Sequence, residues 1–325
     1  MKRKLFTAVM LIVVTVATVF GFAACNKNGN DETIDGAPKN IRVVAPDGTP
    51  ALALFGFFNG NNTFGSYKFN SEIISPSLVS TEFSGKADVI IAPTNAGANF
   101  SKKSGEYKLF SVAVEGSLYV RGKGEGVLTL EKLVSDLKAG KKMASIGKGN
   151  TPELVFSYIL GEDYASVSEN IEWVADGPAA RAKMMREDNP VSYILVGEPA
   201  ATAFTAPLSL TQRLDLQALY KGKSGYDNYP QASVFVKTAL LSDANFVNAL
   251  SEALQKSIDA VNSDETSAET VNAVLKAAGS TSVFPADSKN RANVVFRKAD
   301  STVKNSVTDY LALMGINEVS GIFAF

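Results

Sequence analysis

The chain of 325 residues contains no histidine and one cysteine. Without an imidazole it cannot form a Ser-His-Asp or Cys-His nucleophile pair, a histidine zinc site or a histidine acid-base catalyst. Most familiar hydrolase mechanisms are therefore excluded, and we expect no catalytic residue, no metal site and no cofactor. Paired carboxylates stay chemically available, because two acids in different environments can perform glycosidase-type chemistry.

An excess of charge of either sign is also missing. The chain has 32 Lys and Arg against 33 Asp and Glu, which gives a net charge of -1. Proteins that bind nucleic acids carry a basic face, so we expect no nucleic-acid partner. A single cysteine excludes an internal disulfide framework.

Long hydrophobic runs are scarce except near the N-terminus. Residues 1–4 are basic, residues 5–22 are mostly apolar, and Cys25 follows two alanines. About twenty apolar residues can span a bilayer, so an uncleaved membrane helix is one interpretation. The short basic flank and the small residues before Cys25 favour a processed signal instead. The segment resembles a bacterial lipoprotein signal with its lipobox, with Phe22 at the position where leucine is commoner.

This resemblance implies a lipoprotein signal peptide over residues 1–24 and lipidation of Cys25 as the first mature residue. Two acyl chains suffice for stable anchoring, so the expected location is extracytoplasmic, with a lipid anchor in the cell membrane. Residues 25–39 are rich in Asn, Gly, Asp and Lys and poor in apolar side chains. Such a composition cannot bury enough surface to fold, which predicts a flexible tether.

Short β-branched runs alternate with helical patterns after the tether. Strands are predicted at 41–45, 87–92, 142–146, 171–174 and 191–196. Helices are predicted between them at 51–58, 95–103, 130–138, 152–160, 179–187 and 199–204. Strands separated by crossover helices imply parallel pairing, and the fold class is therefore α/β. The C-terminal third predicts long helices without strong strands between them, at 239–262, 267–278 and 300–314.

Two segments are predicted to cross between lobes. Residues 107–120 are too many for one strand unless the chain bends near Glu115 and Gly116, and residues 229–237 form an extended run. A chain that leaves the first lobe and later returns would place 40–115 plus 232–325 in lobe 1 and 116–231 in lobe 2. Two sequential domains are the alternative, but no Pro/Gly/Ser-rich linker marks their boundary.

Several predicted strands end in loops that lead directly into helices. These loops are rich in Pro, Gly, Thr and Asn and lie at 46–50, 93–95, 147–152, 176–178 and 197–199. Each one alone is explained by ordinary capping, with Thr49 as a predicted N-cap and Pro50 at the first helical position. Their recurrence predicts a shared cleft, because ligands of parallel α/β sheets bind at the carboxyl ends of the strands.

Five sequence runs together resemble the solute-binding lipoproteins of ABC importers in the nitrate, sulfonate, bicarbonate and thiamine-pyrimidine group: IRVVAPDGTPALAL, ADVIIAPTNAGANF, YKLFSVAVEGSLYV, GKGNTPELVFSYIL and VGEPAATAF. The resemblance implies the type II periplasmic-binding-protein fold, in which two α/β lobes close on a small-molecule solute held in the cleft between them. It also implies ABC permease subunits as partners, attachment to the membrane through the lipid anchor, a monomeric receptor and no enzymatic activity.

The resemblance also implies which residues line the cleft: Asp47, Gly48, Thr49, Thr94, Asn95, Ser117, Leu118, Tyr119, Asn150, Thr151 and Gly177. Arg181 falls in the first turn after Gly177, where its guanidinium could reach a carboxylate or sulfonate. A solvated helix charge explains Arg181 equally well. Four aromatic side chains could stack on a planar ligand or pack in the core: Tyr119, Trp173, Tyr226 and Tyr229.

Two other classes of function stay open at this point. One is a cofactor-free enzyme on the same fold, such as a menaquinone-pathway lyase, which would be cytoplasmic and so conflicts with the lipobox. A related pyrimidine synthase consumes its own histidine and carries a cysteine cluster, and this chain has neither. The other class is an adhesion or structural lipoprotein, which would have no cleft. The solute is left open, because Thr, Ser, Asn and backbone amides suit anions and neutral heterocycles alike.

Overall fold

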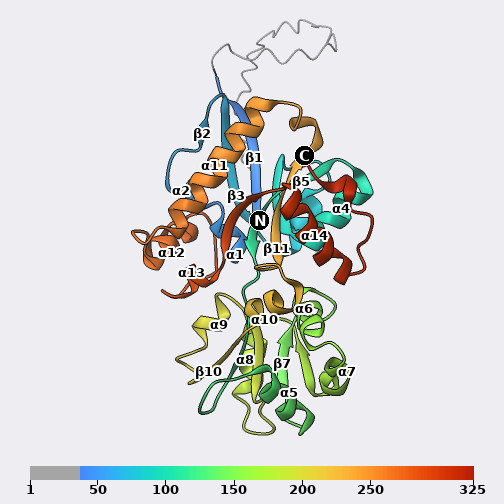
Figure 1. The fold of residues 1–325 in the computed structure, drawn as a ribbon. Helices are drawn as coiled ribbons and strands as arrows, with labels where there is room; N and C mark the ends of the chain where they lie inside the picture. The colour runs from blue at the N-terminus through green and yellow to red at the C-terminus, as the bar shows by residue number, and fades with distance from the viewer. Residues whose placement is uncertain (1–36) are drawn as a thin grey trace, which may run out of the picture. The chain divides into compact units, whose positions relative to one another are not determined.

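The computed structural model describes residues 37–325. The predicted signal peptide, Cys25 and most of the predicted tether lie outside the described residues. Residues 38–325 form one compact unit that contains two β-sheets (Figure 1). No helix within the described part of the chain is long and apolar enough to span a membrane.

The larger sheet has seven strands in the order β12-β5-β11-β4-β1-β3-β2. Their bounds are β1 (Lys39–Pro46), β2 (Thr63–Phe64), β3 (Tyr67–Ile74), β4 (Val89–Pro93), β5 (Tyr107–Glu115), β11 (Pro230–Lys237) and β12 (Val294–Lys298). β1 pairs in parallel with β3 and β4, whereas β11 is antiparallel to β4 and β5. Val44 packs in one hydrophobic cluster and its neighbours Val43 and Ala45 in another, so both faces of this sheet are covered.

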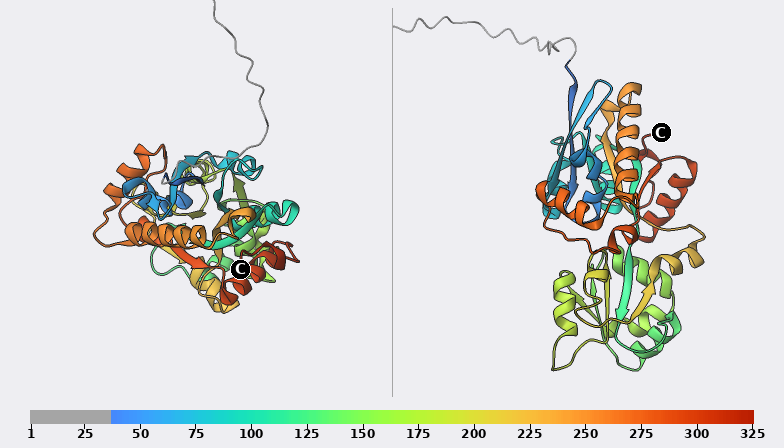
Figure 2. Two further views of the ribbon diagram at one scale, coloured as in Figure 1. Left: turned by 90° about the horizontal axis from the view of Figure 1, so that it is seen from above. Right: turned by 90° about the vertical axis from the view of Figure 1, so that its left-hand side faces the viewer.

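Eight helices belong to this sheet: α1 (Thr49–Leu52), α2 (Phe55–Asn59), α3 (Val79–Glu82), α4 (Thr94–Ser104), α11 (Ala244–Asn262), α12 (Ala268–Ala277), α13 (Ser288–Arg291) and α14 (Ser301–Leu313). We call this sheet and its helices lobe 1. The long helix α11 lies along the lobe (Figure 2). Gly56 of α2 lies so close to α11 that an added Cβ would be 2.6 Å from the Ser257 Cα. The Ser257 hydroxyl accepts from the Gly56 N–H and donates to the Ala53 carbonyl.

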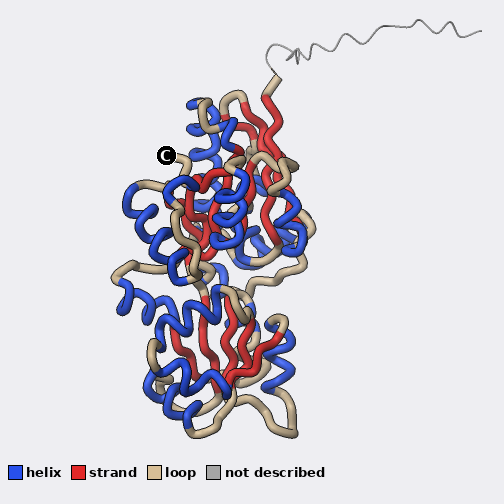
Figure 3. Tube along the Cα trace, turned by 90° about the vertical axis from the view of Figure 1, so that its right-hand side faces the viewer, coloured by secondary structure: helices blue, strands red, loops and turns tan. Residues whose placement is uncertain are grey.

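The smaller sheet has five strands in the order β10-β6-β9-β7-β8. Their bounds are β6 (Leu118–Gly122), β7 (Met143–Ile146), β8 (Ile171–Val174), β9 (Tyr193–Gly197) and β10 (Gln212–Asp215). Six helices accompany them: α5 (Leu130–Lys138), α6 (Thr151–Leu160), α7 (Asp163–Val167), α8 (Gly177–Met184), α9 (Ala200–Ala203) and α10 (Leu216–Ser224). We call this sheet and its helices lobe 2. In each lobe the strands lie in the middle with helices on either side (Figure 3).

The chain passes from one sheet to the other between β5 and β6 and returns between α10 and β11. The two passages touch, because the Gly116 N–H donates to the Tyr229 carbonyl at 2.9 Å. An added Cβ at Gly116 would lie 2.0 Å from a ring carbon of Tyr229. Glycine is therefore required where the first passage crosses the second.

The predicted α/β class is confirmed, but the pairing is only partly parallel. β6 is antiparallel to both of its neighbours, and β12 is antiparallel to β5. β12 also contradicts the expectation that the C-terminal third lacks strands. β3, β10 and β12 are not among the predicted strands, because they are short or carry exposed polar side chains. Examples are Lys68, Asn70 and Glu72 of β3. The helix expected over 51–58 is two short helices, α1 and α2.

Candidate functional site

A pocket of about 440 Å³ lies between the two lobes. This volume falls within the range of about 300–1,000 Å³ that is typical of small-molecule sites. Residues of both lobes line it: Pro50, Pro93, Asn95, Leu118, Ile146, Asn150, Thr151, Pro152, Gly177, Val196, Gly197, Glu198, Ala200, Gln231 and Ala232. The lining is mostly apolar, with a few polar side chains that could orient a ligand.

The starts of five helices contribute to this lining in the described chain. α1, α4, α6, α8 and α9 supply Pro50, Asn95, Thr151, Gly177 and Ala200, respectively. The first N–H groups of a helix lack intrahelical partners, so such ends favour hydrogen-bond acceptors. Proline in the first turns of α1, α6 and α8 removes one donor from each. These helix ends therefore offer fewer free N–H groups to a ligand than helices without proline would.

Glu198 is the one acidic side chain among the described lining residues, and none of them is Lys or Arg. It is buried, with 7% of its surface exposed. Its carboxylate accepts from the Thr202 hydroxyl at 2.8 Å and from the Thr202 N–H at 3.2 Å. Burial raises the pKa of Glu198, and the bonds from Thr202 with the charges of Arg291 and Arg121 oppose that effect.

Side-chain hydrogen bonds join the lobes around the pocket. The Thr49 hydroxyl donates to the Glu198 carbonyl at 3.1 Å, and Arg291 of α13 donates to the Thr202 hydroxyl at 3.2 Å. The Thr151 hydroxyl lies 2.7 Å from the hydroxyl of Tyr310 on α14. The structure therefore holds the two lobes in contact.

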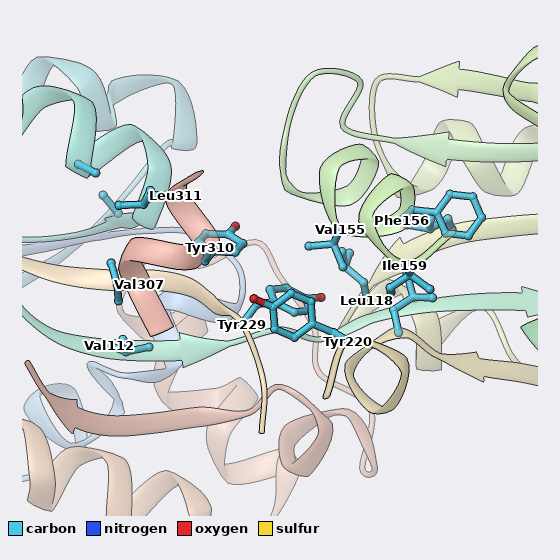
Figure 4. Packing of buried hydrophobic residues seen from close by; sticks show 14 of the residues in the cluster. Val112, Leu118, Val155, Phe156, Ile159, Tyr220, Tyr229, Val307, Tyr310 and Leu311 are labelled. Carbon is cyan, nitrogen blue, oxygen red and sulfur yellow. The ribbon is translucent and has the colours of Figure 1, made fainter. Parts of the chain in front are cut away.

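Buried tyrosines pack where the lobes meet (Figure 4). The ring of Tyr229 stacks on Tyr310 at a centroid distance of 6.0 Å and meets Tyr220 edge-on at 5.2 Å. The Tyr229 hydroxyl donates to the Gln217 side-chain oxygen at 2.8 Å. Burial raises the pKa of both Tyr229 and Tyr310, so both hydroxyls stay protonated. Tyr229 therefore serves packing between the lobes.

Five of the residues expected in the cleft line the pocket: Asn95, Leu118, Asn150, Thr151 and Gly177. Seven others lie outside its lining: Asp47, Gly48, Thr49, Thr94, Ser117, Tyr119 and Arg181. The binding role of all twelve stays a prediction.

Asp47 is engaged within lobe 1. Its carboxylate accepts from the Ser280 hydroxyl at 2.6 Å, from the hydroxyl and N–H of Thr281 at 2.6 and 2.9 Å, and from the Gly48 N–H at 2.8 Å. Partial burial acts to raise the pKa of Asp47, but these hydrogen bonds outweigh it and lower the value to about 2. The carboxylate therefore ties the loop before α1 to the segment after α12. Thr49 is the first residue of α1 and does not cap it, because Gly48 occupies the N-cap position with φ of 103°.

Thr94, Tyr119 and Arg181 also have contacts elsewhere. The Thr94 hydroxyl lies 2.8 Å from the Ser233 hydroxyl, and both residues are buried. Tyr119 is buried in lobe 2, where burial raises its pKa to about 12. The Arg181 guanidinium lies 5.9 Å from the ring centre of Phe204.

Sequence reasoning missed Gln231 and Glu198, two polar residues of the pocket. Glu198 belongs to the run VGEPAATAF, whose position after a strand was the available signal. Gln231 is the second residue of β11 and carries no local signal, because a glutamine near the start of a strand is ordinary. Its side-chain oxygen accepts from the Ser117 N–H at 3.2 Å, which links the two passages of the chain.

No protein-family model matches the chain, and no curated protein matches it. Solved structures do match this chain. An ABC transporter protein from Parabacteroides distasonis is 18% identical, with 88% of this chain and 97% of that one covered and a TM-score of 0.66. The periplasmic aliphatic sulphonate binding protein SsuA from Escherichia coli is 12% identical, covers 88% and 92%, and has a TM-score of 0.62.

The alkanesulfonate-binding protein SsuA from Xanthomonas axonopodis pv. citri, bound to MOPS, is 14% identical, covers 89% and 97%, and has a TM-score of 0.56. At such identities the likeness shows the fold. The predicted periplasmic-binding-protein fold, with two α/β lobes and a cleft between them, is thereby confirmed.

Proposed function

We propose that the protein is an extracytoplasmic, lipid-anchored receptor that binds a small organic or inorganic solute and presents it to the permease of an ABC importer. One observation carries the proposal: the pocket is lined from both lobes, and the chain crosses between the sheets at only two places in residues 37–325. The likeness to sulfonate-binding proteins supports it. The lobe bounds proposed with it are 40–115 plus 232–325 and 116–231.

Binding proceeds by closure of the lobes. A solute that contacts Asn95 of lobe 1 and Thr151 or Gly177 of lobe 2 favours the closed arrangement, because only contacts made in that arrangement bias it. The Thr49 and Arg291 hydrogen bonds between the lobes form in the same arrangement. The seven predicted residues outside the lining stay proposed ligand-binding residues, and Asp47 and Thr94 also brace the segments that carry the contacts.

The first prediction is that a bound solute compacts the protein and is released unchanged. Protein purified without denaturation is analysed by native mass spectrometry to identify the bound molecule, which is then removed by dialysis and added back. Small-angle scattering should show a smaller radius of gyration with the molecule than without it. Equal scattering in both states contradicts closure, and catalytic conversion of the molecule after many equivalents supports the enzyme alternative.

The second prediction concerns Cys25, which lies outside the described residues. Cys25→Ser should leave an unprocessed precursor that no longer incorporates labelled fatty acid, because the thiol is the acylation site of a lipobox. Labelled palmitate followed by gel electrophoresis measures this, with an immunoblot to show equal amounts of both proteins. Undiminished label in the variant contradicts lipidation.

A further inference from the structure

We infer that Gln231 determines the solute specificity of the pocket, and that the solute offers an uncharged hydrogen-bond acceptor to its side-chain amide. This inference rests on the proposed solute binding. It goes further, because it selects uncharged acceptors such as amides, ureas, ketones and heteroaromatic nitrogens over free sulfonates, carboxylates or nitrate.

The orientation of the Gln231 amide follows from its one partner. The Ser117 N–H is a donor, so the group that faces it at 3.2 Å must be the Gln231 side-chain oxygen. Within the described residues, the Gln231 nitrogen makes no hydrogen bond. The side chain lines the pocket, so its two N–H groups are available to a ligand there. A ligand acceptor placed there would satisfy these N–H groups.

The charges around the pocket argue against a free anion. No lining residue in the described chain is cationic, and the buried Glu198 contributes an acid. Three arginines close to the lining residues in the fold lie outside the lining itself. Arg291 donates to Thr202, Arg121 donates to the Thr205 hydroxyl and the Leu210 carbonyl, and Arg181 lies over the Phe204 ring. A desolvated anion in such a pocket would lack a side-chain counter-charge, which is unfavourable.

A second amide side chain lines the same pocket. Asn95 lines the pocket, and its side chain makes no hydrogen bond to any described residue. It therefore offers both a donor and an acceptor. Because a cavity of about 150 Å³ holds benzene, a pocket of about 440 Å³ admits a molecule larger than one aromatic ring. Two amides in a largely apolar pocket suit an uncharged, polar, ring-sized molecule.

Matched probe pairs test the charge preference. Nicotinamide and nicotinate, and benzamide and benzenesulfonate, differ in their polar group and share a ring. We expect the two amides to raise the melting temperature of the wild-type protein at millimolar concentration and to bind at least tenfold more tightly by calorimetry than their acidic counterparts. Acidic probes that bind as tightly as the amides overturn the inference, and so does a panel in which no member raises the melting temperature.

Gln231→Glu tests the residue itself. Glutamate has nearly the same shape and keeps an oxygen for the Ser117 N–H, but it replaces the donor nitrogen with an acceptor. Binding of the amide probes should fall at least tenfold, while the melting temperature without probe shows whether the variant folds. Gln255→Glu, on the exposed side of α11, is the matched control and should bind the probes as the wild type does.

Unchanged amide binding by Gln231→Glu overturns the assignment of this residue. Failure here is distinguishable from failure of the proposed function. Acidic probes that bind and compact the protein would contradict the charge preference and leave solute capture intact. A natively bound molecule that leaves the scattering unchanged would contradict solute capture by closure.

Discussion

Gly116→Ala should destabilise the folded protein by about 1–3 kcal/mol and weaken solute binding, because the added methyl group has no room. Its Cβ would lie 2.0 to 2.4 Å from three ring carbons of Tyr229. Tyr229 cannot move easily, since it is fully buried between Tyr220 and Tyr310. The two passages of the chain would have to separate, which disturbs the point about which the lobes close.

Urea unfolding of the ligand-free protein measures this loss. Gly222→Ala is the matched control, because an added Cβ there meets nothing within 4 Å and the residue lies in α10, where alanine is favourable. The double variant Gly116→Ala with Tyr229→Leu should show strong coupling, because the smaller side chain relieves the clash. Full stability of Gly116→Ala, or additive effects in the double variant, would refute the steric argument.

The parts of the fold that could be predicted are those set by local pattern. The runs at β1 and β4 are buried on both faces and read as apolar strands, and the helix starts at Pro50 and Pro152 carry their own signals. β3 was missed because it has no continuous apolar run, although its alternation of buried and exposed residues is itself the pattern of a half-buried strand. Strand β12 owes its existence to pairing with β5, a partner about 180 residues away in the chain.

The candidate site was predictable as a set of loops but not as a set of side chains. The loop at 46–50 does reach the pocket through Pro50. The Asp47 carboxylate of the same loop instead accepts hydrogen bonds from Ser280 and Thr281, which lie far away in the sequence. Gln231 shows the converse. Its exposure to the pocket depends on where the second passage meets the first, which is a property of the tertiary fold.

Asn95→Ala and Thr151→Ala should each weaken binding of the natively bound solute about tenfold to a hundredfold. Each removes a polar group from the pocket wall, and losing one hydrogen bond to a desolvated ligand costs on the order of 1–3 kcal/mol. Asn95 belongs to lobe 1 and Thr151 to lobe 2, so similar losses at both would show that the solute contacts both lobes. Calorimetry on folded variants measures the affinities.

Thr151 needs a second variant, because its hydroxyl also lies 2.7 Å from that of Tyr310. Tyr310→Phe removes this bond between the lobes and leaves the Thr151 hydroxyl free to bind solute. If Thr151 acts through the solute, Tyr310→Phe should retain most of the affinity that Thr151→Ala loses. Equal losses of affinity in Thr151→Ala and Tyr310→Phe would assign the effect to the bond between the lobes instead.

Lys256→Ala, an exposed position on α11, should leave the affinity for the solute unchanged. Wild-type affinity in both Asn95→Ala and Thr151→Ala would place the binding site elsewhere, since a solute held by both walls must lose contacts when either is trimmed.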